Sequence, residues 1–353
     1  MRTLFCVRPA TRNIGNDVIN KATAALLYDA FGGSAGIVNI PALPGPQFGG
    51  FTAKQVFDMN RFADGVVVGG GNLFENGQLT VDLQALSALR VPMMLIGLSH
   101  GRIYDRTGEL VLRSDSMPSA TIRALVGKAC VTLVRDDASK TMLEALDLQA
   151  IDVGGCPTLF LGESPRVEAD DAPIIISVRH PGRMSVPSTL KWRVPEDVRG
   201  IIAGLRARFA RPILIACHDY ADIEFAGGFP EAPLVYYDEV DRYVRALREC
   251  WLSITYRLHA FLPCLAFGTP SIHVSYDERG ASMVATAGMS AWDVNMMTEP
   301  DVVGTVLARA EAAAEYKQQR CAARSRLESL HQTTSRGVAA FVDAVDVYVR
   351  TRG

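Results

Sequence analysis

A repeated alternation of short apolar runs with amphipathic stretches is the feature that most constrains the fold of this sequence. The runs "TLFCV", "GVVVG" and "PIIISV" contain no charged residue and include several β-branched side chains. Continuous apolar runs of this kind are typical of parallel strands buried on both faces, and the amphipathic stretches between them are typical of covering helices. The alternation therefore predicts an α/β fold with parallel sheets.

The length of the chain and one polar segment predict two domains. The chain has 353 residues, which is more than one ordinary core requires. The segment "GESPRVEADDAP", residues 162–173, is acidic, contains two prolines and separates two α/β series, so we expect a hinge there. The expected units are an N-terminal α/β domain (1–165), a C-terminal α/β domain (172–300) and C-terminal helices (301–353). Two doubly wound, Rossmann-like domains with these helices packing over the join would form a GT-B-like arrangement.

The composition excludes several classes of protein. The chain is 48% hydrophobic and 21% charged, and its formal net charge of −2 lacks the basic excess that nucleic-acid binding requires. Its seven cysteines form no C-x-x-C pair and its six histidines show no i, i+4 spacing, so we expect reduced thiols and no bound metal. No apolar run fits a signal peptide or a transmembrane segment, so we expect a cytoplasmic protein. Peripheral contact with a membrane and the oligomeric state stay open.

Local signals place several helix ends. The first helix is expected from about residue 17 to residue 31, with Asn16 or Asp17 as its N-cap. Asp137 or Asp136 is expected to cap the helix formed by "DASKTMLEALDL". From residue 300 onward two helical patterns follow each other, the first ending in "LESL" and the second in "FVDAVDVYV". These patterns predict the C-terminal helices.

Residues that directly follow strands are candidates for the binding site, because ligands of doubly wound sheets bind outside the carboxyl ends of the strands. In the first half of the chain these residues are Asn13, Gly15, Asn16, Asp17, Gly70, Gly71, Asn72, His100 and Arg135. Glycines let the backbone pass close to a ligand, and the free N–H groups at a helix start attract oxygens and anions. Helix caps, tight turns and local ion pairs explain the same residues, and the sequence leaves this alternative open.

In the second half the residues after strands are Arg179, His218, Arg257, His259, Tyr276 and Arg279. The segment "TYRLHAF" is the most informative, because Arg257 at the tip of a buried strand needs an anion or a carboxylate for its five N–H donors. His259 begins a helix whose dipole favours a neutral imidazole that can give or take a proton. Pro263 forgoes one helix hydrogen bond, so this helix should be short or bent. A structural Arg–Asp pair, with His259 as a capping residue, is the alternative.

The ordered motifs resemble those of one known family. The series "NIGND", "DGVVVGGGNLF", "VRDDAS", "GGCPTLFL", "SVR", "RLHA" and "FGTPSIHVSYDERG" is similar to that of the polysaccharide pyruvyl transferase family over roughly residues 13–280. The resemblance implies transfer of a pyruvyl group from phosphoenolpyruvate to two hydroxyls of a sugar in a cell-surface polysaccharide or its precursor. The products would be a cyclic ketal and phosphate.

The resemblance also implies roles for the candidate residues. Donor binding would fall to Arg257, Arg179 and Arg279, where many members of the family have a lysine in place of Arg279. His259 would move protons, and Asp17 would act as a base toward the acceptor. The acceptor would lie against the first domain, at Asn13, Gly15, Asn16, Gly70, Gly71, Asn72 and His100, while His218, Tyr276 and Arg135 would add substrate contacts. Phosphoenolpyruvate would be a co-substrate and no cofactor is implied; the sugar acceptor would be free, lipid-linked or nucleotide-linked.

Two other functions fit the same domain plan. A GT-B glycosyltransferase would use a nucleotide sugar and would need an acidic residue for the ribose, for which Asp219 or Asp238 is available. A non-catalytic member would hold only a sugar or an anion. The intact pair of Arg257 and His259 favours an enzyme over the non-catalytic alternative.

Overall fold

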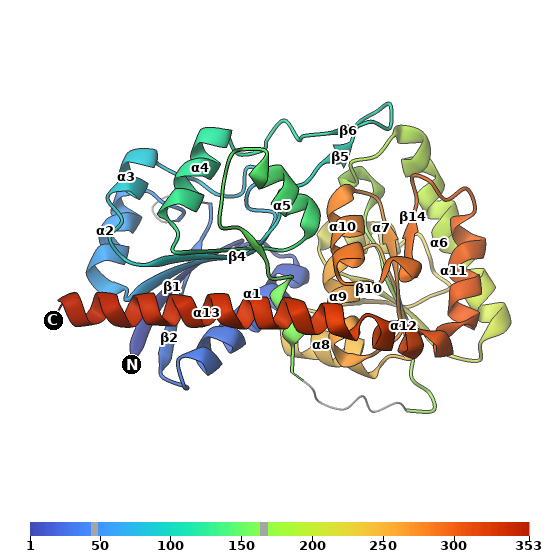
Figure 1. The fold of residues 1–353 in the computed structure, drawn as a ribbon. Helices are drawn as coiled ribbons and strands as arrows, with labels where there is room; N and C mark the ends of the chain where they lie inside the picture. The colour runs from blue at the N-terminus through green and yellow to red at the C-terminus, as the bar shows by residue number, and fades with distance from the viewer. Residues whose placement is uncertain (44–48, 163–168, 353) are drawn as a thin grey trace.

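The computed structural model describes residues 1–43, 49–162 and 169–352 of the chain. In this described part the strands form two six-stranded parallel sheets and one small antiparallel hairpin. Each sheet carries helices on both faces, and the two resulting domains lie side by side (Figure 1). The predicted α/β class with two doubly wound domains is therefore confirmed.

The first domain is built on a sheet with the strand order β2-β1-β3-β4-β7-β8. Its strands are β1 (Arg2–Arg8), β2 (Ala35–Pro41), β3 (Gly65–Gly71), β4 (Met93–Leu98), β7 (Val131–Val134) and β8 (Asp152–Val153). Its helices are α1 (Ile14–Ala30), α2 (Ala53–Phe62), α3 (Leu83–Ser87), α4 (Ser119–Lys128), α5 (Asp137–Glu144) and the 3-10 helix η1 (Pro157–Phe160). The hairpin of β5 (Ile103–Tyr104) and β6 (Leu110–Val111) projects toward the second domain (Figure 1).

The second domain repeats this plan with the strand order β11-β10-β9-β12-β13-β14. Its strands are β9 (Ile174–Ser177), β10 (Ile213–Cys217), β11 (Leu234–Tyr236), β12 (Leu252–Thr255), β13 (Ser271–Ser275) and β14 (Asp293–Asn295). Its helices are η2 (Pro181–Arg183), α6 (Ser188–Arg208), α7 (Tyr220–Ala226), α8 (Val240–Glu249), α9 (Leu258–Phe267), α10 (Glu278–Thr286), η3 (Ser290–Trp292) and α11 (Val302–Glu311). The chain changes sheet between β8 and β9, an interval that contains the predicted hinge, of which residues 163–168 lie outside the described residues.

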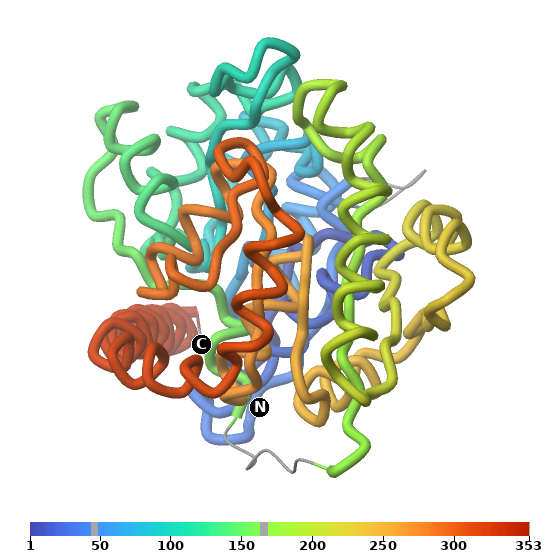
Figure 2. The backbone as a smooth tube through the Cα atoms, turned by 90° about the vertical axis from the view of Figure 1, so that its right-hand side faces the viewer, coloured from blue at the N-terminus to red at the C-terminus, as the bar shows by residue number. Residues whose placement is uncertain are grey.

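The C-terminal segment crosses from the second domain back to the first. It consists of η4 (Ala313–Glu315), α12 (Tyr316–Ala322) and α13 (Arg324–Arg352), so the two predicted patterns resolve into a shorter helix series and one long helix. Leu330 of α13 belongs to the core of the second domain, whereas Phe341 and Val345 pack beneath the first sheet. Helix α13 therefore packs over the join, along both domains in Figure 1 and nearly end-on in Figure 2.

One helix start differs from the prediction by a few residues, and a second selects one of two predicted caps. Helix α1 begins at Ile14, and its N-cap is Asn13, whose side chain accepts a hydrogen bond from the N–H of Gly15. The predicted caps Asn16 and Asp17 thus lie inside the first turn. Sequence alone did not rank these three polar residues, since each is a favoured capping type. Asp136 rather than Asp137 caps α5, because it accepts from the N–H of Ser139 at 2.9 Å.

Helix α9 is bent at its start, as the sequence predicts. His259 has the non-helical angles φ −83° and ψ 20°, and Pro263 lies inside the helix. The helix ends at Gly268, whose positive φ of 76° forms a left-handed C-cap. The bend turns the first residues of α9 away from the axis of the rest of the helix.

Helix α1 joins the two domains through apolar contacts. Its residues Ile14, Val18 and Ala22 share a buried cluster with Tyr243 and Leu247 of α8.

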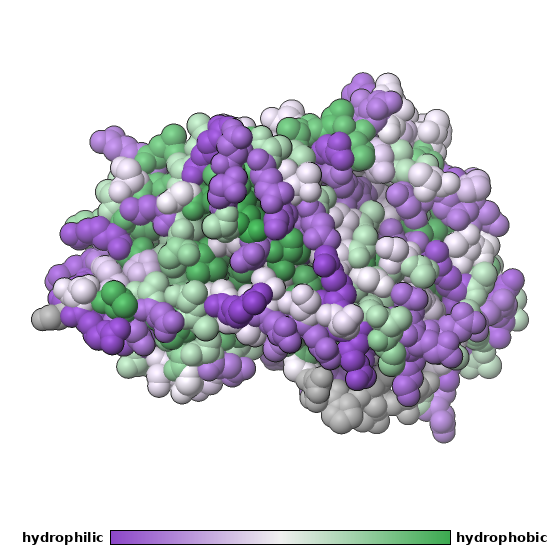
Figure 3. All heavy atoms as spheres, in the orientation of Figure 1, coloured by the Kyte–Doolittle hydropathy of each residue, from purple (hydrophilic) through white to green (hydrophobic). Residues whose placement is uncertain are grey.

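The outer surface in Figure 3 is mixed, with apolar residues gathered at the upper edge around the β5–β6 hairpin, where Val111 and Leu112 are exposed. Within the described ranges, none of the helices combines the length and apolar character needed to cross a membrane.

Gly70 tests how tightly the glycine segment packs. It has a φ of +70°, and a Cβ built on it would lie 2.1 Å from Cγ2 of Ile19 in α1. Gly70→Ala is therefore expected to lower the free energy of unfolding by roughly 2–4 kcal/mol, through backbone strain and overpacking together. The measurement is urea-induced unfolding followed by circular dichroism.

Gly127→Ala is the matched control. This helical glycine has nothing within 4 Å of its built Cβ, so alanine should raise the free energy of unfolding by roughly 0.5–1 kcal/mol. A Gly70→Ala protein as stable as wild type would contradict the tight packing of the glycine segment on α1.

Candidate active site

A cavity of about 820 Å³ lies between the two domains. Its walls come from the loops and helix starts that follow the carboxyl ends of strands in both sheets, which is where doubly wound sheets bind ligands. Eleven of the predicted site residues line it: Asn13, Asn16, Gly71, Asn72, Arg135, Arg179, His218, Arg257, His259, Tyr276 and Arg279. The strand-end criterion thus brings together residues that are up to 266 positions apart, from Asn13 to Arg279.

Four predicted residues lie outside the cavity lining. Asp17 is not among the lining residues, and its carboxylate lies 3.7 Å from the guanidinium of Arg8, so its role as a base stays a prediction. Gly70 has the packing role described above. His100 is buried against the edge of Phe74, and its backbone N–H donates to the hydroxyl of Ser139.

Gly15 lies just behind the cavity wall. A Cβ at this position would approach Cβ of His259 to 3.2 Å and Nδ1 of His218 to 3.4 Å. Gly15 is therefore not a direct contact in the cavity lining. Its missing side chain lets α1 approach the two histidines closely.

Arg257 is held from behind by groups of the second domain. Its Nε donates to the carbonyl of Val178 at 3.2 Å, and its Nη2 donates to the carboxylates of Asp219 at 3.0 Å and of Asp222. Asp222 is completely buried and also accepts from the backbone N–H of His180 and of His218. The Arg–Asp pair that the sequence left as an alternative is therefore present. Among the residues that the structure describes, Nη1 of Arg257 has no partner, and this group remains for a ligand.

Arg279 lies between carboxylates of both domains. Its Nε donates to Asp277 at 2.9 Å, and its Nη1 lies 3.3 Å from Oε2 of Glu75, which comes from the loop after β3. Arg135 is paired with Asp136 at 3.2 Å, and its Nη2 reaches the carbonyl of Arg279 at 3.5 Å. These contacts fix two cations of the cavity wall before any substrate binds.

Arg179 is the most weakly paired of these four arginines. Its Nη2 donates to the backbone carbonyl of Arg183, and its Nη1 is 3.7 Å from Asp219, a carboxylate that Arg257 already occupies. Its Nε is buried and has no hydrogen-bond partner in the described part of the chain. Burial lowers the pKa of Arg179, which is expected of a cation with too little counter-charge. An anion in the cavity would supply that charge.

Of the three histidines that line the cavity, His218 and His259 are held neutral by their surroundings. Burial, reinforced by the charges of Arg135 and Arg257, lowers the pKa of His259 to about 3. Burial also lowers the pKa of His218 well below its usual value, and Nε2 of His218 lies 2.6 Å from the hydroxyl of Tyr243. Nε2 of His259 is buried without a partner among the described residues, so its hydrogen-bonding capacity is unused.

The first domain contributes amides to the opposite wall. Besides the capping oxygen of Asn13, these are the side chain of Asn16, which donates to the hydroxyl of Thr11 at 2.6 Å, and that of Asn72. The amide oxygen of Asn72 accepts from the hydroxyl of Ser99 at 3.0 Å, which turns the NH₂ group away from Ser99. Asparagine amides both donate and accept, which suits sugar hydroxyls.

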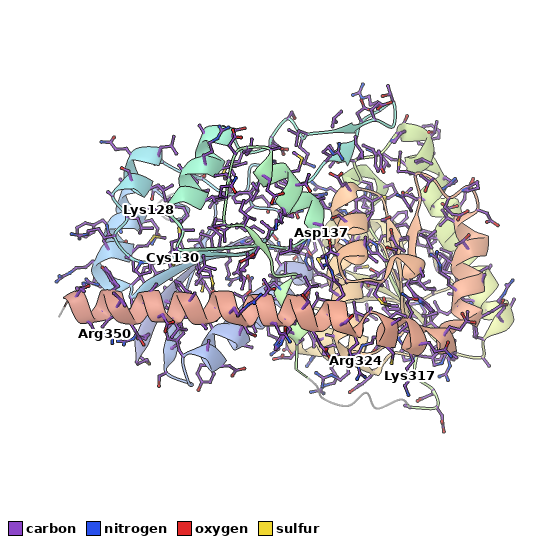
Figure 4. All side chains as sticks on the ribbon, in the orientation of Figure 1. Lys128, Cys130, Asp137, Lys317, Arg324 and Arg350 are labelled. Carbon is purple, nitrogen blue, oxygen red and sulfur yellow. The ribbon has the colours of Figure 1, made fainter. Side chains whose placement is uncertain are left out.

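The walls are held together by contacts between the domains. The N–H of Ile14 donates to the carbonyl of His218, and Arg102 forms a bidentate pair with Glu278 at the start of α10. Asp137, labelled in Figure 4 near the junction of the domains, accepts from Thr286 of α10 and from Arg326 of α13. These hydrogen bonds and ion pairs join the two domains around the cavity.

Several residues that line the cavity do not directly follow a strand, so the strand-end criterion did not predict them. Arg12 directly precedes Asn13 in the loop after β1, and Arg183 is the last residue of η2, so a criterion applied to the whole segment between a strand and the next long helix would have found both. Lys191 lies inside α6 and His273 inside β13, where no sequence signal marks a binding residue. Across residues 1–43, 49–162 and 169–352, no group of three or more histidine, cysteine or acidic side chains could hold a metal ion.

Solved structures with the same two-domain plan define the class of the fold. S. aureus MnaA, in a co-structure with UDP, gives a TM-score of 0.57 at 11% identity and covers 91% of both chains. A putative UDP-N-acetylglucosamine 2-epimerase from Listeria monocytogenes gives 0.56 at 12% identity, over 90% of this chain and 89% of that chain. The UDP-GlcNAc 2-epimerase from Methanocaldococcus jannaschii gives 0.52 at 12% identity, over 91% and 98%. The protein thus has a two-domain GT-B-type fold, as predicted.

The family assignment rests on the sequence and not on these structures. Their similarity to this chain establishes the fold alone, because the sequence identity is low. Residues 13–278 match the family model described as polysaccharide pyruvyl transferase. The match covers most of the chain, so the protein belongs to the polysaccharide pyruvyl transferase family, and the predicted resemblance is confirmed. No match to a curated protein sequence was found.

The buried neutral histidines predict how stability depends on pH. In the unfolded chain His259 would titrate near its ordinary pKa of about 6.5, whereas the folded value is about 3. The unfolded state therefore binds more protons as the pH falls below about 6.5, and the free energy of unfolding should decrease steadily toward about pH 4. His259→Gln should flatten this decrease, measured by urea unfolding at a series of pH values. The exposed His331, changed to Gln, is the control; equal slopes for His259→Gln and wild type would contradict the burial of a neutral imidazole.

Proposed function

We propose that the protein transfers the pyruvyl group of phosphoenolpyruvate to two hydroxyls of a sugar that belongs to a cell-surface polysaccharide or its precursor. Membership of the family supports this proposal. The observation that carries it is the under-paired Arg179 together with Nη1 of Arg257, both facing one cavity that also contains His259. A small donor with a phosphate and a carboxylate would supply the missing anionic partners.

The reaction balances without an external reagent. In the first step a sugar hydroxyl adds to C2 of phosphoenolpyruvate, and its proton ends on C3, which becomes a methyl group. In the second step the other hydroxyl attacks C2, the bond from C2 to the phosphate oxygen breaks, and the second proton leaves with the phosphate. The chemistry therefore consists of two additions of a hydroxyl at C2, each coupled to one proton transfer, and arginines can stabilise the negative charge throughout.

His259 fits the first proton transfer. It is neutral at rest because of its low pKa, so it can take the proton of the attacking hydroxyl and return it to C3. An anionic donor would partly offset the positive charges of Arg135 and Arg257 around it, which favours the transient imidazolium. The acceptor would lie on the opposite wall, against Asn16 and Asn72.

Three further cations at the cavity support an acceptor that carries phosphate. Arg12 and Arg183 are exposed, and Lys191 is half-buried on α6; all three line the cavity. None of the three forms an ion pair with a carboxylate among the described residues, although Arg12 donates to the hydroxyl of Tyr220. Phosphoenolpyruvate does not require this many cations. A lipid-linked or nucleotide-linked sugar would bring the additional phosphates.

A nucleotide-sugar glycosyltransferase is less well supported by the site. Of the two acidic residues considered for a ribose, Asp238 does not line the cavity. Asp219 does line it, but its carboxylate already accepts from Arg257 and lies beside Arg179. An assay of the released product separates the two functions, since a pyruvyl transferase releases phosphate from phosphoenolpyruvate whereas a glycosyltransferase releases the nucleotide from a UDP-sugar.

His259→Ala is expected to separate chemistry from donor binding. Phosphoenolpyruvate should still bind, because the arginines are unchanged, while turnover should fall by roughly 10²–10⁴-fold for loss of a proton-transfer group. Calorimetry measures binding, and acceptor-dependent phosphate release measures turnover. A decrease of less than about tenfold in a folded variant would remove His259 from the mechanism.

Arg179→Lys tests the donor site with a residue that keeps its charge. The guanidinium geometry is lost, so binding of phosphoenolpyruvate should weaken by roughly tenfold or more, the value of one charge-assisted hydrogen bond. Arg257→Lys should also weaken binding and should additionally destabilise the fold, because Asp222 would lose its fixed partner. Arg208, an exposed arginine of α6 paired with Glu311 and outside the cavity lining, provides the control Arg208→Lys. Unchanged donor binding in Arg179→Lys would contradict the assignment.

Arg183→Ala combined with Lys191→Ala tests the acceptor. The KM for a phosphate-linked sugar should rise by roughly tenfold or more, while the KM for the same sugar without phosphate should hardly change. Undecaprenyl-type and UDP-linked forms of one sugar, compared side by side, distinguish the two carriers. Equal effects on neutral and phosphorylated acceptors would show that these cations serve another purpose.

The proposal includes no metal or cofactor. We expect incubation with EDTA to leave phosphate release unchanged, because arginines take the charge-stabilising role. Loss of activity that one divalent ion restores would contradict this expectation.

A further inference from the structure

A histidine–aspartate pair lies beside the proposed donor site. His273 on β13 and Asp293 on β14 are register partners in neighbouring parallel strands. Nδ1 of His273 and Oδ1 of Asp293 are 2.7 Å apart, and Oδ2 of Asp293 accepts from the hydroxyl of Ser275 at 2.8 Å. Both carboxylate oxygens are therefore occupied, and this geometry favours the imidazole tautomer that carries its N–H on Nδ1 and a lone pair on Nε2.

The Nε2 edge of this imidazole faces the cavity. His273 is only 2% exposed, yet it is part of the cavity lining. Gly280, in the first turn of α10, also lines the cavity, and a Cβ built on it would lie 2.8 Å from Cε1 and 3.4 Å from Nε2 of His273. The missing side chain at position 280 leaves the ring edge uncovered. Within the described residues Nε2 has no hydrogen-bond partner.

We propose that His273, oriented by Asp293, is a second proton-transfer residue of this active site and serves the step in which phosphate leaves. The inference rests on the proposed function. In this step Nε2 of His273 takes the proton of the second sugar hydroxyl, and the oxygen of that hydroxyl forms a bond to C2. The bond from C2 to the phosphate oxygen breaks with its electron pair on the phosphate, and Nε2 returns the proton to that oxygen.

The chemistry favours two separate imidazoles. The first step delivers a proton to C3 and the second to a phosphate oxygen, so the acceptor atoms lie on different sides of C2. His259 and His273 reach the cavity from α9 and from β13. Asp293 stabilises the imidazolium that forms when Nε2 of His273 is protonated. His259 has no such carboxylate partner and lies near the charges of Arg135 and Arg257. Asp293 is therefore a positioning residue and His273 a catalytic one.

His273→Asn is the sharpest variant, because the amide NH₂ of asparagine can replace Nδ1–H toward Asp293 while nothing replaces Nε2. The variant should bind phosphoenolpyruvate like wild type, and phosphate release should fall by roughly 10²–10⁴-fold. Free imidazole in the buffer should restore part of the activity. Acid-quenched reactions analysed by mass spectrometry should contain the adduct of sugar and phosphoenolpyruvate that still carries phosphate. His331→Asn, on the exposed histidine that packs on Phe160, is the control.

Several results would overturn the inference. Phosphate release within about threefold of wild type would do so, and so would a loss that imidazole does not restore in a folded variant. If His273→Asn does not fold, ¹⁵N NMR of the histidine rings in wild type decides, because the inference requires a protonated Nδ1, an unprotonated Nε2 and a change of the Nε2 signal when phosphoenolpyruvate is added. A wild-type protein that neither binds phosphoenolpyruvate nor releases phosphate would instead contradict the proposed function. In that case an Nε2–H tautomer in the NMR spectrum would separately contradict the geometry of the pair.

Discussion

The packing of α1 between the two domains is the contact on which the cavity depends. Ile14, Val18 and Ala22 bury their side chains against α8 of the second domain, and burial of apolar surface contributes about 25 cal/mol per Å². Asn13 caps the same helix, so the contact that joins the domains also places first-domain amides opposite the imidazoles of the second domain. On the other side of the cleft, the pair of Arg102 and Glu278 makes the corresponding polar contact.

Charge is distributed in the cavity so that little remains to be reorganised when an anion binds. The buried Arg257 and the partly buried Arg279 are held by carboxylates, which offsets the cost of removing them from water. Buried nitrogens without a hydrogen bond remain on Nε of Arg179 and Nη1 of Arg279, and the described residues offer no partner to Nη1 of Arg257. Burial lowers the pKa of His259, and the nearby charges of Arg135 and Arg257 lower it further, so this imidazole is neutral before a substrate binds. Donor binding and proton transfer are therefore two consequences of one arrangement of charges.

Local patterns predicted the strands and the general position of the site, but they ranked neighbouring polar residues poorly. Asn13, Asn16 and Asp17 are all good capping residues, and only the path of the chain after β1 selects Asn13. The same choice places Asp17 inside the first turn of α1, where its carboxylate lies near Arg8 and outside the cavity lining. His273, in contrast, was not predicted as a site residue at all. A histidine in the middle of a buried strand has no local signal, because its exposure depends on the glycine at position 280 and its orientation on Asp293 from the next strand.

The sequence by itself determined the α/β class, the two doubly wound domains, the family and most of the residues at the strand ends, because apolar periodicity and the order of the motifs are local properties of the chain. Only the tertiary structure decided which of those residues share the cavity and which donors remain free. Arg257 illustrates the reason: its sequence position predicts that it needs an anionic partner, but Asp222 and Asp219 supply one only because β10 and β12 flank β9 in the same sheet. Partners that are distant along the chain are fixed by packing, and packing is a property of the whole fold.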